Sequence, residues 1–205
     1  MSTLAWIFLL AISCGVLNAF EQRRRIALLG SVLRSYQIER LMEQLTDGYL
    51  RWLDEKDPER RTPLWNLLLE AEHTLAGQMA NFARDFASSV SAPQAQVSKL
   101  PFAMPYAQQL LPRARLFDAR RLFELHSRGL QAAMDNAARL QDKDRAYMIT
   151  AELLLFQHTC HWFCRSRSVA DARLLARHRT PWRQVVASVS DDTRSDYLAL
   201  VGRRY

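Results

Sequence analysis

The pattern of hydrophobic positions begins with an apolar stretch at the N-terminus. None of the first 20 residues carries a charged side chain, and residues 4–20 (LAWIFLLAISCGVLNAF) are almost wholly apolar. At a rise of about 1.5 Å per residue, a helix over this stretch nearly crosses a hydrocarbon core of about 30 Å. The sequence therefore predicts a short transmembrane anchor over residues 1–21, with residues 4–20 in the membrane.

Basic residues flank this stretch on one side only. Arg23, Arg24 and Arg25 follow it, and no Lys or Arg precedes it. Because basic flanks tend to stay in the cytoplasm, we interpret these three residues as a topology signal. A cleaved signal peptide is disfavoured, since the stretch lacks a basic lead. We expect a single-pass protein of a bacterial inner membrane, with its N-terminus outside and its C-terminal domain cytoplasmic.

Helical periodicity continues after the apolar stretch. Apolar residues recur at spacings of three and four, so the first helix is predicted to run on to about residue 54, with possible bends at Gly30 and Gly48. The Asp57-Pro58 step indicates a turn. Thr62-Pro63 is a typical helix start, and the helix after it is predicted to end near Ser88.

Four prolines mark residues 88–112 as one long connection. The apolar segment 100–106 within it is expected to cover the core; docking to a partner or dipping into a membrane is the alternative. A third helix is predicted from Pro112 to about Leu140, with His126 on its heptad seam as a hydrogen-bonded core residue.

The fourth helix is predicted to be the most buried one. It starts near Asp142, and between Ala146 and Cys164 only Glu152 is formally charged. Short helices are expected to start at Ser168, Thr180-Pro181 and Ser190 in the sequence that follows, and no stretch alternates like a strand. The prediction is an all-α fold: a single transmembrane helix continuing into a cytoplasmic bundle of about four long helices, plus short C-terminal helices. The expected divisions are an anchor (1–21), a bundle (22–164, with the loop at 88–112) and an Arg-rich tail (165–205).

Four side chains of metal-ligating types cluster at the end of the fourth helix: His158, Cys160, His161 and Cys164. Their positions fan over one side of a helix, so pairs of them could share a soft ion such as zinc or copper. Phe156, Trp162 and Phe163 lie among them, which favours a core helix with small apolar cysteines and hydrogen-bonded histidines. We therefore expect no cofactor, with a zinc or copper site as the alternative.

Enzymatic signatures are sparse in the sequence. Glu70 and His73 have the E-x-x-H spacing of di-iron bundles, but only one copy is present and it is predicted to face solvent. Phosphate-binding loops, nucleophile elbows and paired C-x-x-C motifs are absent from the sequence. We do not expect an enzyme.

The net charge of +7 comes from 28 basic and 21 acidic residues, and all but three of the basic ones are Arg. Most of the surplus lies in residues 165–205. Such a surface can contact an anionic lipid or an acidic partner, or can simply be solvated; nucleic acid ranks below these. The candidate contact residues are Arg165, Arg167, Arg173, Arg177, Arg179 and Arg183.

These patterns together favour a non-enzymatic, membrane-anchored scaffold or regulatory protein. Its expected partner is a membrane-associated protein complex or a second copy of the chain. The first alternative is a metal or redox sensor that uses the His158, Cys160, His161 and Cys164 cluster. The second alternative is an Arg-mediated nucleic-acid binder.

Overall fold

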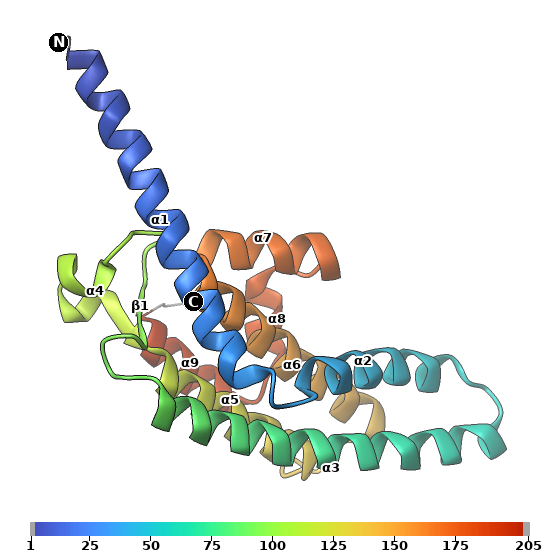
Figure 1. Ribbon diagram of the computed structural model, residues 1–205. Helices are drawn as coiled ribbons and strands as arrows, with labels where there is room; N and C mark the ends of the chain where they lie inside the picture. The colour runs from blue at the N-terminus through green and yellow to red at the C-terminus, as the bar shows by residue number, and fades with distance from the viewer. Residues whose placement is uncertain (1–2, 203–205) are drawn as a thin grey trace.

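The structure is a computed structural model that describes residues 3–202, with side chains from Trp6 onward (Figure 1). The all-α class is confirmed, because these residues form nine α-helices and only two short strands. The helices are α1 (Thr3–Leu33), α2 (Ile38–Asp54), α3 (Pro58–Ser89), α4 (Ala107–Leu110), α5 (Ala119–Met134), α6 (Asp142–Cys164), α7 (Arg167–His178), α8 (Trp182–Ser188) and α9 (Asp191–Val201). The strands are β1 (Gln96–Ser98) and β2 (Leu116–Asp118), and a 3₁₀ turn spans Arg113–Arg115.

The expected membrane anchor is corrected by the structure. Among the helices of residues 3–202, none combines the length and the apolarity that crossing a membrane requires. The apolar run of α1 is interrupted by Asn18 and reaches charged residues from Glu21 onward, so only part of this helix is apolar. This finding contradicts the transmembrane helix over residues 4–20 and the single-pass location in a bacterial inner membrane. Residues 1 and 2 of the expected segment lie outside the described residues.

Arg25 does not act as a free basic flank, because it is only 8% exposed. Its Nε donates to Glu21 Oε1 at 3.1 Å, and its other nitrogens donate to the backbone oxygens of Gln96 and Phe163 at 2.9 and 3.4 Å. These bonds join α1 to β1 and α6. Arg25 therefore fastens α1 to the helical body, while Arg23 and Arg24 remain exposed.

The first helix ends much earlier than the periodicity predicted. α1 stops at Leu33, and α2 starts at Ile38 and takes a different direction (Figure 1). The backbone N–H of Gln37 donates to Gln78 Oε1 at 2.7 Å, which ties the turn to α3. Gly48 lies within α2, which continues past it to Asp54. It allows α2 and α3 to approach closely, since a Cβ added there would collide with the side chain of Leu68.

The start of α3 is set by its first residues. Asp57 caps the helix by accepting the backbone N–H of Glu59 at 3.0 Å, and Pro58 takes the first helical position. The helix therefore begins at Pro58, ahead of the expected Thr62-Pro63 start, and Pro63 lies inside it. Its end at Ser89 agrees with the expected end near Ser88.

The core is centred on α6, as the sequence predicted, since α6 contacts α1, α2, α5, α7 and α8. Aromatic side chains of α3, α5 and α6 pack edge to face in its interior. The rings of Phe86 and Phe123, for example, have centroids 4.8 Å apart and planes at 78°. Such pairs add to the stabilisation that burial of their apolar area provides. His126 is buried in this core, and its Nε2 lies 2.8 Å from Thr159 Oγ1, as expected for a hydrogen-bonded histidine.

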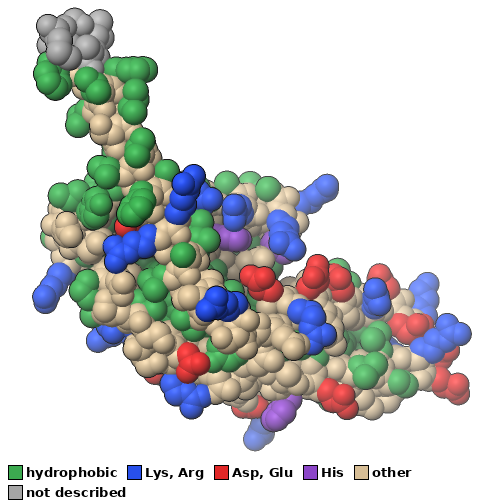
Figure 2. Space-filling model, in the orientation of Figure 1, with side chains coloured by type: hydrophobic (Ala, Val, Ile, Leu, Met, Phe, Trp, Pro, Cys, Tyr) green, Lys and Arg blue, Asp and Glu red, His purple; other side chains and the backbone are tan. Residues whose placement is uncertain are grey.

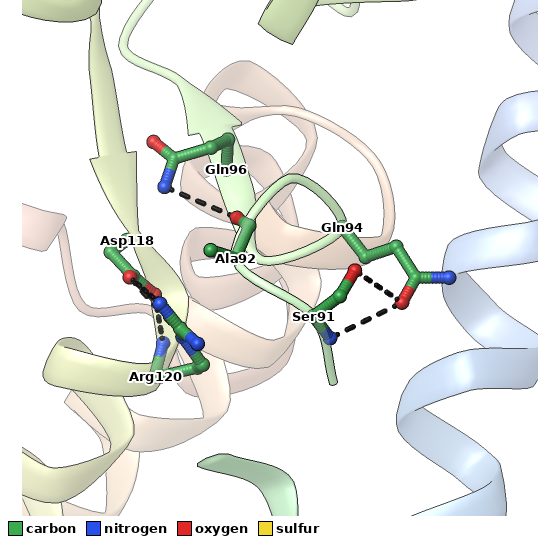
Figure 3. Close-up of polar contacts among 6 residues, drawn as sticks. All are labelled: Ser91, Ala92, Gln94, Gln96, Asp118 and Arg120. Atoms are coloured by element: carbon green, nitrogen blue, oxygen red, sulfur yellow. Dashed lines mark hydrogen bonds and ion pairs between the residues drawn. The ribbon is translucent and has the colours of Figure 1, made fainter. Parts of the chain in front are cut away.

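The connection between α3 and α5 is more ordered than the proline content indicated. β1 and β2 pair antiparallel, with Val97 opposite Phe117. Figure 3 shows the turn before β1, where Ser91 Oγ donates to Gln94 Oε1 at 2.8 Å, and the start of α5, where Asp118 accepts the backbone N–H of Arg120 at 2.9 Å. This cap places the start of α5 at Ala119, after the expected start at Pro112.

Candidate functional site: a groove between α2 and α7

A groove of about 910 Å³ separates α2 from α7, with α6 beneath it and part of α1 beside it. Figure 2 shows it as the hollow between the part of the molecule that carries α7 and the part that carries α2. We call it the α2–α7 groove. Its residues are Ile26, Leu29, Gly30, Leu33, Glu39, Arg40, Met42, Glu43, Thr46, Asp47, Leu50, Leu153, Leu154, Phe156, Gln157, Cys160, His161, Cys164, Arg165, Arg173, Arg177 and His178.

The floor of the α2–α7 groove is apolar. It is built mainly from α6, whose sequence is apolar on most sides and therefore presents hydrophobic side chains here as well as to the core. Leu153 and Phe156 are buried beneath the floor, while Leu154 and Cys160 are partly exposed on it. α7 and α2 stand apart over this strip, so an apolar surface lies open between them.

One wall of the groove is acidic. Glu39, Glu43 and Asp47 follow one another at intervals of four residues along α2, which places them on one face of the helix. All three side chains are exposed, and with Arg40, which also lines the groove on α2, they leave this wall a net charge of −2. We call these three residues the acidic wall, and Figure 2 shows acidic side chains along this side of the hollow.

The opposite wall is basic. Arg173 and Arg177 are four residues apart on α7, and Arg165 follows the end of α6. We call these three residues the basic wall. Arg165 donates to Gln22 Oε1 at 2.5 Å, and Arg173 lies 3.2 Å from the Nδ1 atom of His161.

His161 holds one of these arginines in place. Burial and the nearby positive charge of Arg173 lower the pKa of His161 to about 4, so its ring is neutral near pH 7. A neutral ring with Nδ1 unprotonated can accept an N–H from the guanidinium. The histidine is therefore a partner that orients Arg173 toward the groove and does not add a positive charge.

The four predicted metal ligands are divided by the structure. Cys160, His161 and Cys164 line the groove, whereas His158 is buried with its Nε2 2.8 Å from Asp171 Oδ1 and reaches only an adjoining pocket of about 390 Å³. Across the described chain, no set of three or more His, Cys, Asp or Glu side chains is placed to hold a metal ion.

The thiols of Cys160 and Cys164 are also poorly suited to nucleophilic attack or metal binding. Both cysteines are free, and burial raises the pKa of Cys160 and raises that of Cys164 to about 11. The thiolate is the nucleophile and the metal ligand, so thiols that stay protonated near pH 7 are weak in both roles. The groove surface at these positions is therefore apolar in character.

Only three of the six arginines predicted as contact residues line the groove. Arg165, Arg173 and Arg177 form the basic wall, while the side chain of Arg167 donates to the backbone oxygen of Lys99 at 3.4 Å. Arg179 ends α7 in a left-handed conformation, with φ at 52°, and Arg183 lies on α8. Residues 203 and 204, which carry two further arginines of the tail, lie outside the described residues.

Two features of the structure were missed by the sequence interpretation. The acidic wall was missed, although the four-residue spacing of Glu39, Glu43 and Asp47 is visible in the sequence. The second feature is a buried ion pair between Arg145 and Glu72. Glu72 Oε1 also accepts a hydrogen bond from the Tyr49 hydroxyl at 2.7 Å. Nothing local marks Glu72 as buried, since the neighbouring Glu70 and His73 are exposed, as expected.

No protein-family model, curated protein or solved structure matches the chain. The structure itself describes the chain as an all-α protein with an apolar groove between walls of opposite charge.

Proposed function

We propose that the chain is a non-enzymatic helical scaffold protein that binds another protein through the α2–α7 groove. The observation that carries the proposal is the apolar floor left uncovered between the acidic and basic walls. Apolar surface at the centre of an interface provides binding free energy, and charged groups at its rim provide orientation and specificity. The raised thiol pKa values favour a binding role for this surface over thiol chemistry.

The N-terminal part of α1 supports the same role. Its large apolar side chains from Trp6 to Phe20, here called the N-terminal arm, are between 43% and 73% exposed. The arm projects from the helical body (Figure 1), and α1 runs without a break from the arm to the groove residues Ile26 and Leu29. Exposed apolar surfaces of this extent mark interaction sites. We infer that the protein bound in the groove also covers the arm.

Two matched variants test the proposed function. Ile26 lines the groove and is 41% exposed, and Leu69 on α3 lies outside it and is 38% exposed. Ile26→Asp and Leu69→Asp therefore introduce the same charge at equally exposed positions, and both are expected to fold.

The measurement is co-purification of proteins with the tagged full-length chain from the cells that naturally make it, quantified by mass spectrometry. We expect a partner that the wild type and Leu69→Asp retain and that Ile26→Asp loses. Equal recovery with both variants, or no partner with the wild type, would contradict the proposal.

A further inference from the structure

The two walls of the α2–α7 groove carry opposite charges across one apolar floor. From this arrangement we infer the chemistry of the partner segment: it is an amphipathic α-helix with an acidic edge beside α7 and a basic edge beside α2. The inference rests on the proposed function and adds what the groove recognises.

The acidic wall selects the basic edge. Its three carboxylates repeat every four residues along α2, so the first and the last are eight residue steps, or about 12 Å of helix, apart. A partner helix lying alongside α2 presents side chains at the same interval of about four residues on one edge. Lys or Arg at three successive positions of this kind can therefore face Glu39, Glu43 and Asp47 together.

The basic wall selects the acidic edge in the same way. Arg173 and Arg177 are also four residues apart, and the hydrogen bond with His161 orients Arg173. The guanidinium group binds carboxylates with two parallel N–H donors. Glu or Asp side chains four residues apart on the partner are the matching groups.

The groove favours a helix over an extended peptide. An extended segment gains affinity by adding its backbone to an open sheet edge. All the residues around this groove belong to helices or helix ends, whose backbone groups are largely bonded within the helices. A partner whose own backbone is also internally bonded, as in a helix, can bury its apolar face on Leu154 and Ile26 without leaving backbone groups unpaired.

The acidic wall also argues against a nucleic acid in the groove. Phosphates that approach Arg173 and Arg177 would lie opposite the carboxylates of α2, which repel them. A helix with mixed edges meets favourable charges on both sides. The mixed charge of the groove therefore favours a protein helix over a nucleic acid as its ligand.

Synthetic helices test the inference directly. The probe is a fluorescent peptide of about 18 residues with a Leu stripe, Glu along one edge and Lys along the other, a length sufficient for measurable helicity. The controls have the same stripe with Glu on both edges or Lys on both edges. Exchanging the two edges is not a control, because a helix turned end to end presents them in the original order.

We expect the mixed-edge peptide to bind the full-length chain about tenfold more tightly than either control, since several exposed ion pairs replace repulsions. Fluorescence anisotropy gives the dissociation constants. In the double variant Arg173→Glu/Arg177→Glu only Arg165 of the basic wall remains basic, so both walls carry a net negative charge and the preference should move to the peptide with Lys on both edges. A role of these arginines in folding alone would weaken all three peptides equally.

Equal affinities for the three peptides, or an unchanged preference in the double variant, would overturn the inference. Failure of all three peptides to bind would also overturn it. In each case the proposed function is judged separately, by whether Ile26→Asp loses a partner that Leu69→Asp retains.

Discussion

Glu152 provides the sharpest test of how the tail helices are held on the bundle. Its side chain is 1% exposed on α6, and its Oε1 accepts the backbone N–H of Ser190, the residue before α9, at 3.3 Å. Burial raises the pKa of this carboxyl from its ordinary 4.5 to about 7, and hydrogen bonds with Ser190 and Thr193 only partly offset the effect. The folded chain therefore holds this proton over a pH range in which the unfolded chain releases it.

The sign of the pH effect follows from this difference. Between pH 4.5 and 7 the folded state binds more protons at Glu152, so the free energy of unfolding falls as the pH rises through this range. The two pKa values correspond to a total loss of about 3 kcal/mol, essentially complete by pH 8. Glu152→Gln cannot ionise and keeps an oxygen that accepts the Ser190 N–H, so it should lack this loss.

The assay is urea-induced unfolding of the wild type and Glu152→Gln at several values between pH 4.5 and 8. We expect the stability of the variant relative to the wild type to increase by about 3 kcal/mol over this range. His126, whose pKa burial lowers to about 3, destabilises the fold as the pH falls below about 6.5, but it does so in both proteins and cancels in the comparison. Parallel stability curves for the two proteins would refute the reasoning.

Three further predictions concern packing, the attachment of α1 and the thiols. Gly129→Ala should destabilise the fold by about 1–3 kcal/mol in urea unfolding, because the added methyl group collides with Thr193 of α9; an unchanged midpoint would show that α9 is not packed there. Arg25→Ala should lower the free energy of unfolding by about 2–3 kcal/mol in the same measurement, because Arg25 makes buried hydrogen bonds. Arg24→Ala, at an exposed position, should change it by no more than about 0.5 kcal/mol. Equal effects of the two substitutions would contradict the role of Arg25 in fastening α1. The Cys164 thiol should react with iodoacetamide more slowly than free cysteine at pH 7, because its raised pKa leaves less thiolate, and the rate should rise toward pH 10. Equal rates for Cys164 and free cysteine at pH 7 would contradict the raised pKa.

Local signals predicted several parts of the fold. Ser190 caps α9 by accepting the backbone N–H of Thr193 at 3.1 Å, as expected from the sequence. The central position of α6 followed from its lack of charged residues. Such features depend on neighbouring residues or on composition, so a single sequence contains the information.

Features that depend on distant contacts were not predicted. The turn after Leu33 contains no Gly or Pro, and it is held by Tyr36 and Gln37, which bond to Asp85 and Gln78 on α3. The paired strands are only three residues long, too short to show an alternating pattern.

The candidate site was predicted only in pieces for the same reason. Cys160, His161 and Cys164 were considered as ligands, and Arg173 and Arg177 as a separate basic surface, because they belong to different helices. Only the turn between α1 and α2 places the acidic wall opposite them. The three sets of residues then form one groove.

The central claim, that the α2–α7 groove binds a protein, is tested most directly by photo-crosslinking in the cells that naturally make the chain. A photoreactive amino acid replaces Thr46, which lines the groove, or Glu124, an exposed residue of α5 outside it. We predict a discrete protein adduct from position 46 and none from position 124. The same adducts from both positions, or an adduct at position 46 that mass spectrometry identifies as a lipid or a nucleic acid, would contradict the claim.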